Sequence, residues 1–386
     1  MTDEATPQVL LTQARLPVGG LHRRHREQHL GAVASAITGA FRDQGPVRLG
    51  PRRNLVVIAV DGLGYPHAAR ALRPDVFLPL TSEFPTTTIA CLLTSVTGQP
   101  ADTHGFIGVQ YLHADGLRTV NCHDGQVADP TGPAPARPTR TPELPTVFDV
   151  LARDGIPTTV LPGELAGLHS EVLGRLLHGA DQIAPALPPA PDPLGRMRTF
   201  GDQISELAAA RPAALTWAYL DLDTHIHRHG FDDKLHAAAV ALDGVVQRLR
   251  ADGAAVLVFS DHGLTPNHPS ADTLAAWQAA TSERWCRLPA GGAGRTRWIY
   301  PHPRYADRLA GQLAEQIPDA TVVGHEQLAQ WGLVAPGSVG QRRLGEIILL
   351  AHGPDFPAPD TTTGYEHGSM TADEVLVPLA IWHPAT

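Results

Sequence analysis

Cysteine is scarce in this sequence, and its placement excludes two common uses of the residue. Cys91, Cys122 and Cys286 lie far apart and are odd in number. A disulfide framework needs pairs, and a CxxC zinc knuckle needs two cysteines close together. We therefore expect a reducing compartment and no thiolate metal site.

Long apolar runs and clusters of basic residues are also missing. No stretch approaches the roughly 18 apolar residues of a membrane-spanning helix. The N-terminus, MTDEATPQVLLTQARLPVGG, has no basic region followed by an apolar one. The formal net charge is −9, and no run of Lys or Arg is long enough to follow a duplex backbone. We expect a cytoplasmic protein that binds neither a membrane nor a nucleic acid duplex, although bound cations would let it bind phosphate esters.

Three continuous apolar runs end in acidic residues. They are residues 54–61 (NLVVIAVD), 214–221 (ALTWAYLD) and 254–261 (AAVLVFSD). Strands buried on both faces lose the polar alternation, so each run is typical of a central parallel strand. The carboxyl ends of parallel strands share one edge of a sheet. We therefore expect the polar residues after these strands to come together.

Helical patterns separate the strands. Apolar residues recur at spacings of three and four over residues 233–250, and Gly253 follows as a stop signal. Further helices are predicted over residues 142–153, 200–210 and 304–316. The alternation predicts an α/β fold: a doubly wound, mostly parallel sheet with helices on both faces.

The order of the predicted strands and helices also predicts how the chain divides into domains. Residues 51–386 are expected to form the catalytic domain, preceded by an N-terminal extension over residues 1–50. A long interruption at residues 264–345 includes a strand-like segment and a helix. We predict that it is a small inserted subdomain over the edge of the sheet.

Residues that could perform chemistry occur at four places, of which two lie in the N-terminal half. Asp61 ends the first strand, although a lone Asp there is more often a helix cap or a turn residue. Thr86, Thr87 and Thr88 precede an apolar helical run. A hydroxyl at a helix N-terminus suits a phosphoryl oxygen, but a Thr there is as often just an N-cap.

The third place is the segment YLDLDTHIHRHG. Asp223 and His227 are four residues apart, a spacing that puts both on one face of a helix. A carboxylate with an imidazole is a typical half of a zinc site. His225 and His229 lie close by, but such residues are more often polar surface groups than ligands.

The fourth place combines two distant segments. Asp261 and His262 lie at the end of a predicted strand, and the chain turns at Gly263. Both side chains can therefore coordinate one metal ion. His367 stands in TGYEHGSM near the C-terminus. Taken alone, neither segment distinguishes a ligand from an ordinary polar residue.

Together these residues follow the order of a known family. The order is a strand-end Asp, a Thr opening a helix that ends in T-G, D-x-x-x-H-x-x-G, D-H-G and a C-terminal H-G. The chain resembles the alkaline phosphatase superfamily, and within it the nucleotide pyrophosphatase/phosphodiesterase branch and its bacterial relatives, over roughly residues 54–382. Five ordered matches are far more specific than any one. They are Asp61, Thr88 with Thr97 and Gly98, Asp223 with His227 and Gly230, Asp261 with His262 and Gly263, and His367 with Gly368.

The resemblance implies an alkaline-phosphatase-like fold and two zinc ions as cofactors. It implies that Thr88 is the nucleophile and passes through a phosphothreonine intermediate. The implied ligands are Asp223, His227 and His367 for one zinc, and Asp61, Asp261 and His262 for the zinc beside Thr88.

Two departures from the family pattern concern the substrate. Animal phosphodiesterases have an Asn three residues after the nucleophile that helps hold a phosphoryl oxygen, and here that position is Cys91. A thiol is a weak donor, so the backbone N–H of Ile89 and the metals are expected to carry more of the charge stabilisation. Alkaline phosphatases proper have an Arg after the nucleophile within the helix, whereas no Arg follows Thr88 here. This absence favours phosphodiester substrates over monoesters. The C/S-x-P-x-R signature of sulfatases is missing.

The sequence thus predicts a metal-dependent hydrolase of small-molecule phosphate esters, acting on phosphodiesters or nucleotide pyrophosphates. One alternative is a phosphomonoesterase or phosphonate hydrolase on the same scaffold, serving a specialised biosynthetic pathway. Another is a catalytically inactive metal-binding protein. The retained nucleophile and all six ligands argue against inactivity, since a degenerate site should have lost some of them.

Overall fold

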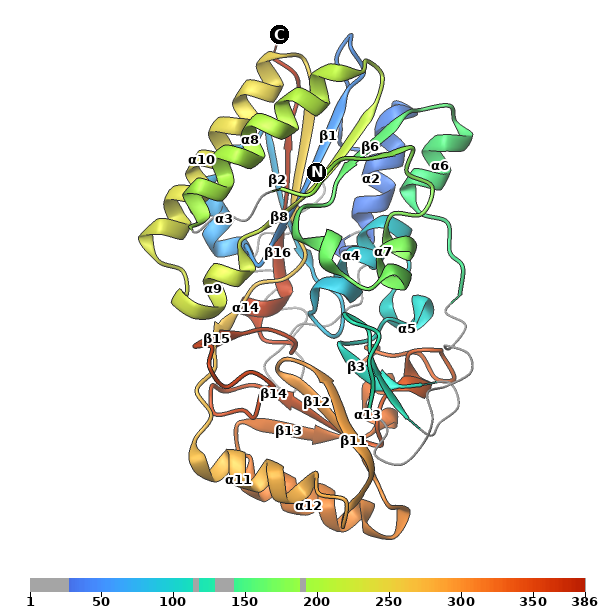
Figure 1. Ribbon diagram of the computed structural model, residues 1–386, viewed down its shortest axis with the longest axis vertical. Coiled ribbons are helices and arrows are strands. Elements are labelled where there is room, and N and C mark those ends of the chain that lie inside the picture. The colour runs from blue at the N-terminus through green and yellow to red at the C-terminus, as the bar shows by residue number, and fades with distance from the viewer. Residues whose placement is uncertain (1–27, 114–117, 129–141, 188–191, 386) are drawn as a thin grey trace, which may run out of the picture.

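The fold contains two sheets, one above the other in Figure 1. The computed structural model describes residues 28–113, 118–128, 142–187 and 192–385. A large, mostly parallel sheet has helices on both faces, and a second sheet lies at one end of it. The predicted α/β fold class is confirmed.

The large sheet holds the three predicted central strands side by side. Its seven strands are ordered β2-β16-β9-β1-β8-β6-β7. β1 pairs in parallel with β8 and β9, whereas β16 runs antiparallel to both of its neighbours. Every residue of β1 and β8 is buried, which explains the missing polar alternation. The bounds are β1 Leu55–Asp61, β2 Val76–Thr81, β6 Thr158–Leu161, β7 Gln182–Ile183, β8 Leu215–Asp221, β9 Ala255–Ser260 and β16 Leu376–Trp382.

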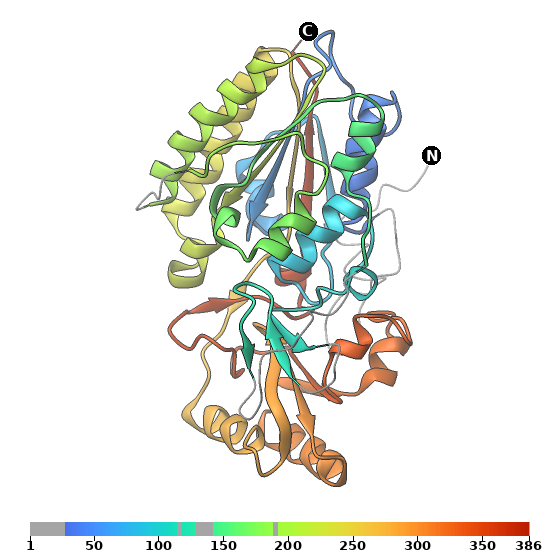
Figure 2. The ribbon, with the colours of Figure 1, turned by 45° about the vertical axis from the view of Figure 1, so that its right-hand side comes forward.

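Two groups of helices cover the two faces of this sheet (Figures 1 and 2). Val56, Ile58 and Val60 of β1 pack in one apolar cluster with α3, α8 and α10, and Leu55, Val57 and Ala59 pack in another with α2, α4, α6 and α7. Within the ranges given above, no helix is both long and apolar enough to cross a membrane. The bounds are α2 Ala32–Phe41, α3 Tyr65–Ala71, α4 Thr88–Thr97, α6 Val147–Arg153, α7 Ser170–Leu176, α8 Pro193–Ala210 and α10 Asp233–Ala251.

Capping residues set the helix starts that the sequence pattern placed differently. α8 begins at Pro193 rather than at residue 200, because the carboxylate of Asp192 accepts a hydrogen bond from a first-turn N–H. α6 begins at Val147 rather than at residue 142, because Thr146 opens a capping box there. Apolar periodicity alone does not reveal such caps.

The second sheet draws on distant parts of the chain. Its order is β13-β14-β12-β11-β3-β4-β5, and it packs against α11 (Ala271–Ala280) and α12 (Ala306–Gln316). β11, β12 and β13 lie within residues 264–345, whereas the other four strands lie outside that range. The division of the chain into domains therefore stays a prediction. The bounds are β3 Gln110–Leu112, β4 Thr119–Asn121, β5 Val127–Ala128, β11 Cys286–Ala293, β12 Thr296–Pro301, β13 Ala320–Val323 and β14 Ile347–Ala351.

Short elements complete the structure. β10 (Thr265–Pro266) pairs with β15 (Tyr365–Glu366) between the two sheets. α2 lies within residues 1–50 and contacts α4 and α6, so the described part of this segment packs on the main core. The remaining elements are α5 Ala101–His104, α9 Asp223–His229, α13 His325–Gln330, α14 Ala372–Val375 and the 3-10 turns Gly163–Gly167, Pro303–Tyr305 and Gln341–Arg343.

Candidate active site

Three carboxylates gather where the central strands end. Asp61 is the last residue of β1, Asp261 follows β9, and Asp223 opens α9 just after β8. The parallel register sets Asp61 beside Asp221, so the strands end at the same level. The side chains of Asp61 and Asp261 are 3% and 1% exposed. The expected convergence of these residues is therefore present in the fold.

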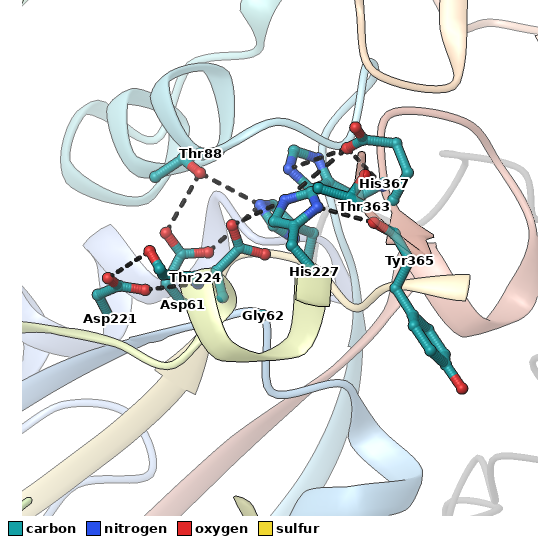
Figure 3. Close-up of polar contacts among 12 residues, drawn as sticks. Asp61, Gly62, Thr88, Asp221, Thr224, His227, Thr363, Tyr365 and His367 are labelled. Carbon is teal, nitrogen blue, oxygen red and sulfur yellow. Dashed lines mark hydrogen bonds and ion pairs between the residues drawn. The ribbon is translucent and has the colours of Figure 1, made fainter. Parts of the chain in front are cut away.

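Thr88 opens helix α4 directly above this cluster (Figure 3). Its Oγ1 lies 3.3 Å from Asp61 Oδ2 and 3.2 Å from His262 Nε2. The first N–H groups of a helix lack intrahelical partners and form the positive end of its dipole. The Thr88 hydroxyl thus lies between a carboxylate–imidazole cluster and a site that favours anions.

Backbone carbonyls orient two of the histidines. His227 Nδ1 donates to the Tyr365 carbonyl at 2.8 Å, and His367 Nδ1 donates to the Thr86 carbonyl at 2.6 Å. Because a carbonyl can only accept, Nδ1 carries a proton in both rings, and in the neutral ring the Nε2 lone pair faces the site. Metal-binding histidines are commonly fixed in this way.

The surroundings of the site shift the pKa values of its carboxylates and imidazoles in different directions. Burial raises the pKa of Asp61, and the neighbouring Asp261 and Asp223 raise it further. Burial also raises the pKa of Asp261, although His262 opposes the shift. For Asp223, burial acts in the same direction, but His227 holds its pKa below the usual range. Burial would lower the pKa of His227, and Asp223 instead raises it to about 10.

Several carboxylate oxygens are buried without a partner. Among the described residues, no hydrogen-bond donor meets Asp61 Oδ1, Asp223 Oδ1 or Asp261 Oδ2. An unpartnered buried carboxylate oxygen is costly, and a divalent cation would relieve this cost. The donor set of carboxylates and imidazoles suits zinc. The site therefore fits the metal ions that the resemblance implies.

The possible ligand atoms fall into three overlapping groups, each with its atoms within 4.8 Å of one another. Asp61, Asp261 and His262 form one group, as the sequence predicts. In addition, Asp223 Oδ2 lies 3.0 Å from His227 Nε2. All six predicted ligands belong to these overlapping groups, but Asp223, His227 and His367 do not form a group of their own. The other two groups are Asp223 with His262 and His367, and His227 with Glu366 and His367.

Two residues of the site are not predicted by the sequence motifs. Tyr219, on β8, donates a hydrogen bond to Asp61 Oδ2, and it is buried. The sequence does offer one indication of Tyr219: it is a tyrosine in a mainly apolar strand, two residues before the strand-end Asp221. Glu366 lies next to His367, and burial raises its pKa to about 7 although His227 opposes the shift. Its signal was a carboxylate directly beside a predicted ligand.

Ile89 and Cys91 occupy the first turn of α4, as predicted. The Cys91 thiol is fully buried and lies 3.2 Å from Ser82 Oγ. Ser82 Oγ in turn donates to the Asp261 carbonyl. This contact directs the thiol toward Ser82, under the helix. The backbone N–H of Ile89 belongs to the first turn of α4, where N–H groups have no intrahelical acceptor.

Other polar residues near the site have structural contacts. His225 Nε2 lies 2.9 Å from Asp232 Oδ1, and neither His225 nor His229 is in any of the three ligand groups of the described chain. Arg295 is 1% exposed, and its Nε lies 3.2 Å from Glu374 Oε1. Arg297 donates to the carbonyl of Pro357. These contacts hold both guanidinium groups within the protein.

The sequence matches the family described as "Type I phosphodiesterase / nucleotide pyrophosphatase" over residues 55–354. The chain belongs to this family. The predicted membership of the alkaline phosphatase superfamily is thereby confirmed. Members of the family are phosphoester hydrolases with a typical metal dependence, and the protein is an enzyme of this class.

Solved structures of family members and relatives share the fold. Murine ectonucleotide pyrophosphatase/phosphodiesterase 5 is 17% identical, with a TM-score of 0.59 over 86% of this chain and 88% of that chain. The human counterpart is 16% identical, with a TM-score of 0.60 and the same coverage. Phosphonoacetate hydrolase from Sinorhizobium meliloti 1021 is 17% identical, with a TM-score of 0.59 over 87% and 91%. No curated protein matches the sequence. Likeness at these identities concerns the fold alone.

The contact between Tyr219 and Asp61 leads to a prediction about metal affinity. In Tyr219→Phe, Asp61 loses a donor that fixes its orientation, so we expect metal affinity about 10- to 100-fold weaker. Competition with a chelator, starting from metal-free protein, measures this affinity. Tyr300→Phe is the matched control, because Tyr300 lies on β12 in the second sheet and its buried hydroxyl donates to the Arg343 carbonyl. Equal metal affinity in wild type and Tyr219→Phe would contradict the positioning role.

Proposed function

We propose that the protein cleaves phosphodiester or nucleotide pyrophosphate bonds of small molecules with two zinc ions, through a phosphothreonine intermediate. One observation carries the proposal: Thr88 Oγ1 lies 3.3 Å from Asp61 and 3.2 Å from His262, at the N-terminus of α4. A nucleophilic hydroxyl needs both an activating partner and a place for the phosphoryl oxygens, and both are adjacent here.

The proposed ligands divide into two sets. Asp61, Asp261 and His262 would hold the zinc beside Thr88. Asp223, His227 and His367 would hold the other. Bound zinc lowers the pKa of a hydroxyl or of water and stabilises charge on phosphoryl oxygens.

The chain's own residues would perform the remaining steps. The Thr88 hydroxyl gives its proton to solvent water, and its Oγ1 bonds to phosphorus in line with the leaving group, which departs with the electron pair of its own bond. Water later hydrolyses the phosphothreonine. The Ile89 N–H donates to a phosphoryl oxygen, because the α4 N-terminus favours negative charge. The Cys91 thiol lies against Ser82, so Cys91 would help to position α4 rather than bind the phosphate.

The relatives support more than one substrate class. One related structure is the inactive murine ectonucleotide pyrophosphatase/phosphodiesterase 5 in complex with AMP, which supports a nucleotide substrate. Phosphonoacetate hydrolase covers 87% of this chain, so a phosphonate hydrolase or phosphomonoesterase is the second candidate. A catalytically inactive metal-binding protein is a weaker third, because Thr88 lies within hydrogen-bond distance of the cluster.

Metal removal provides the first test. We expect active protein to contain about two equivalents of zinc, because six Asp and His ligands suit two such ions. Dialysis against a chelator should abolish hydrolysis, and zinc should restore it. Elemental analysis and activity are measured on the same samples. Active protein without any transition metal would refute the proposal.

The second test replaces the nucleophile. Thr88→Ala should lose at least about a thousandfold in kcat, because the attacking oxygen is gone, while zinc content stays unchanged. Thr87→Ala is the matched control, since Thr87 is the N-cap residue and its side chain makes no capping hydrogen bond. Initial rates with an aryl phosphodiester report the difference. Near-normal rates in Thr88→Ala would assign the attack to Thr87, Thr86 or water.

The third test concerns the substrate class. No Arg follows Thr88 within α4, and Arg295 is paired with Glu374, so the site has few cations for a monoester dianion. Each missing charge-assisted contact is worth about 1.5–3 kcal/mol. We therefore expect kcat/KM for an aryl nucleotide diester to exceed that of the aryl monoester by more than about tenfold. An equal or reversed ratio would favour the phosphomonoesterase alternative.

A further inference from the structure

We propose that Glu366 is a direct ligand of the metal ion that His227 and His367 hold. This inference rests on the proposed metal-dependent function. It adds a carboxylate to a site whose family pattern requires only Asp223, His227 and His367. The sequence motif gave Glu366 no role.

The distances fit shared coordination. Glu366 Oε1 lies 3.8 Å from His227 Nε2 and 3.7 Å from His367 Nε2. Two atoms bound at about 2.0–2.1 Å to a tetrahedral zinc ion are about 3.3 Å apart. Both distances from Glu366 exceed this spacing by only about half an ångström, and the three atoms all lie within 4.8 Å of one another. They form a group of possible ligands that does not include Asp223.

The backbone around Glu366 holds its carboxylate toward the histidines. Glu366 ends the short strand β15, where it pairs with Thr265 of β10. The His367 N–H donates to Glu366 Oε1 at 3.0 Å, which turns the carboxylate back along the chain. The preceding carbonyl, that of Tyr365, accepts from His227 Nδ1 at 2.8 Å (Figure 3). One segment of three residues therefore orients one imidazole and supplies two further side chains.

The balance of charge also favours a cation beside Glu366. The side chain of Glu366 is 8% exposed, and its recorded ion-pair contacts are with His227 and His367. Both rings donate Nδ1–H to a carbonyl, so their Nε2 atoms face Glu366 as lone pairs when the rings are neutral. A buried carboxylate that faces two nitrogen lone pairs is stabilised by a positive charge placed between the carboxylate and the two nitrogens. A divalent ion at this position supplies it.

The same reasoning makes the two halves of the centre alike. Asp61 and Asp261 give the ion beside Thr88 two negative ligands. Without Glu366, the other ion has a single negative ligand, Asp223. Glu366 would supply a second negative ligand to that ion. Each dication would then be neutralised by two carboxylates, which leaves the centre less attractive to a monoester dianion.

Zinc titration of the full chain tests the proposal. Metal-free wild type, Glu366→Gln and the control Glu346→Gln are titrated with zinc in competition with a chromophoric chelator. Glu346 is a suitable control, because its side chain is 48% exposed and pairs with Arg287 away from the site. We expect Glu366→Gln to weaken one of the two zinc affinities at least about tenfold and to leave the other within about threefold. Equal melting temperatures of the metal-free proteins verify the fold.

A second measurement separates coordination from simple charge attraction. In the zinc-bound crystal structure of the wild type, a Glu366 oxygen should lie about 2.0–2.2 Å from a zinc ion. A separation above about 3 Å would refute the proposal even if the affinity falls, since it would leave only an electrostatic effect.

The titration also separates this proposal from the proposed function. Wild type that binds no zinc would refute both. Wild type that binds two zinc ions and turns over phosphodiesters, with unchanged affinities in Glu366→Gln, would refute the role of Glu366 alone.

Discussion

The mutual repulsion of buried carboxylates is the constraint on which this site depends. Asp61, Asp223 and Asp261 lie close together at the ends of the central strands, and burial raises the cost of their charges. Coulomb repulsion in a low-dielectric interior is far stronger than in water. The imidazoles of His227 and His262 offset part of it. The orphaned oxygens that remain make a divalent cation the natural counter-charge.

The second sheet takes part in the site through its β11–β12 turn. Gly294 and Gly368 both have positive φ angles, of 53° and 122°. A Cβ on Gly294 would collide with the His367 carbonyl, and a Cβ on Gly368 would collide with the Ala293 carbonyl. This close approach lets the Arg295 N–H donate to the His367 carbonyl at 2.7 Å. The turn thereby fixes the position of a predicted metal ligand from outside the main sheet.

The segment before Thr88, the proposed nucleophile, is also linked to this C-terminal segment. The Thr86 carbonyl accepts from His367 Nδ1, and the Thr86 hydroxyl accepts from the Gly368 N–H at 2.8 Å. Thr86 stands two residues before Thr88, so one stretch of backbone positions both the ring of a predicted metal ligand and the hydroxyl of the proposed nucleophile. A displacement at the start of α4 would therefore move the His367 ring and the Thr88 hydroxyl together.

The order of the sequence motifs, through the family resemblance, picked out six residues that come together in space. The sequence by itself also determined the fold class and the three central strands. It could do so because buried parallel strands have a recognisable apolar pattern and because their carboxyl ends meet at one edge. The resemblance already implies Thr88 rather than Thr86, and the tertiary structure adds that the Thr86 hydroxyl is used in contacts with residues 368 and 369. The tertiary structure alone brought Tyr219 to Asp61 and Glu366 to His227. The reason is physical: these contacts join residues more than a hundred positions apart, and no local spacing encodes the distance between their side chains.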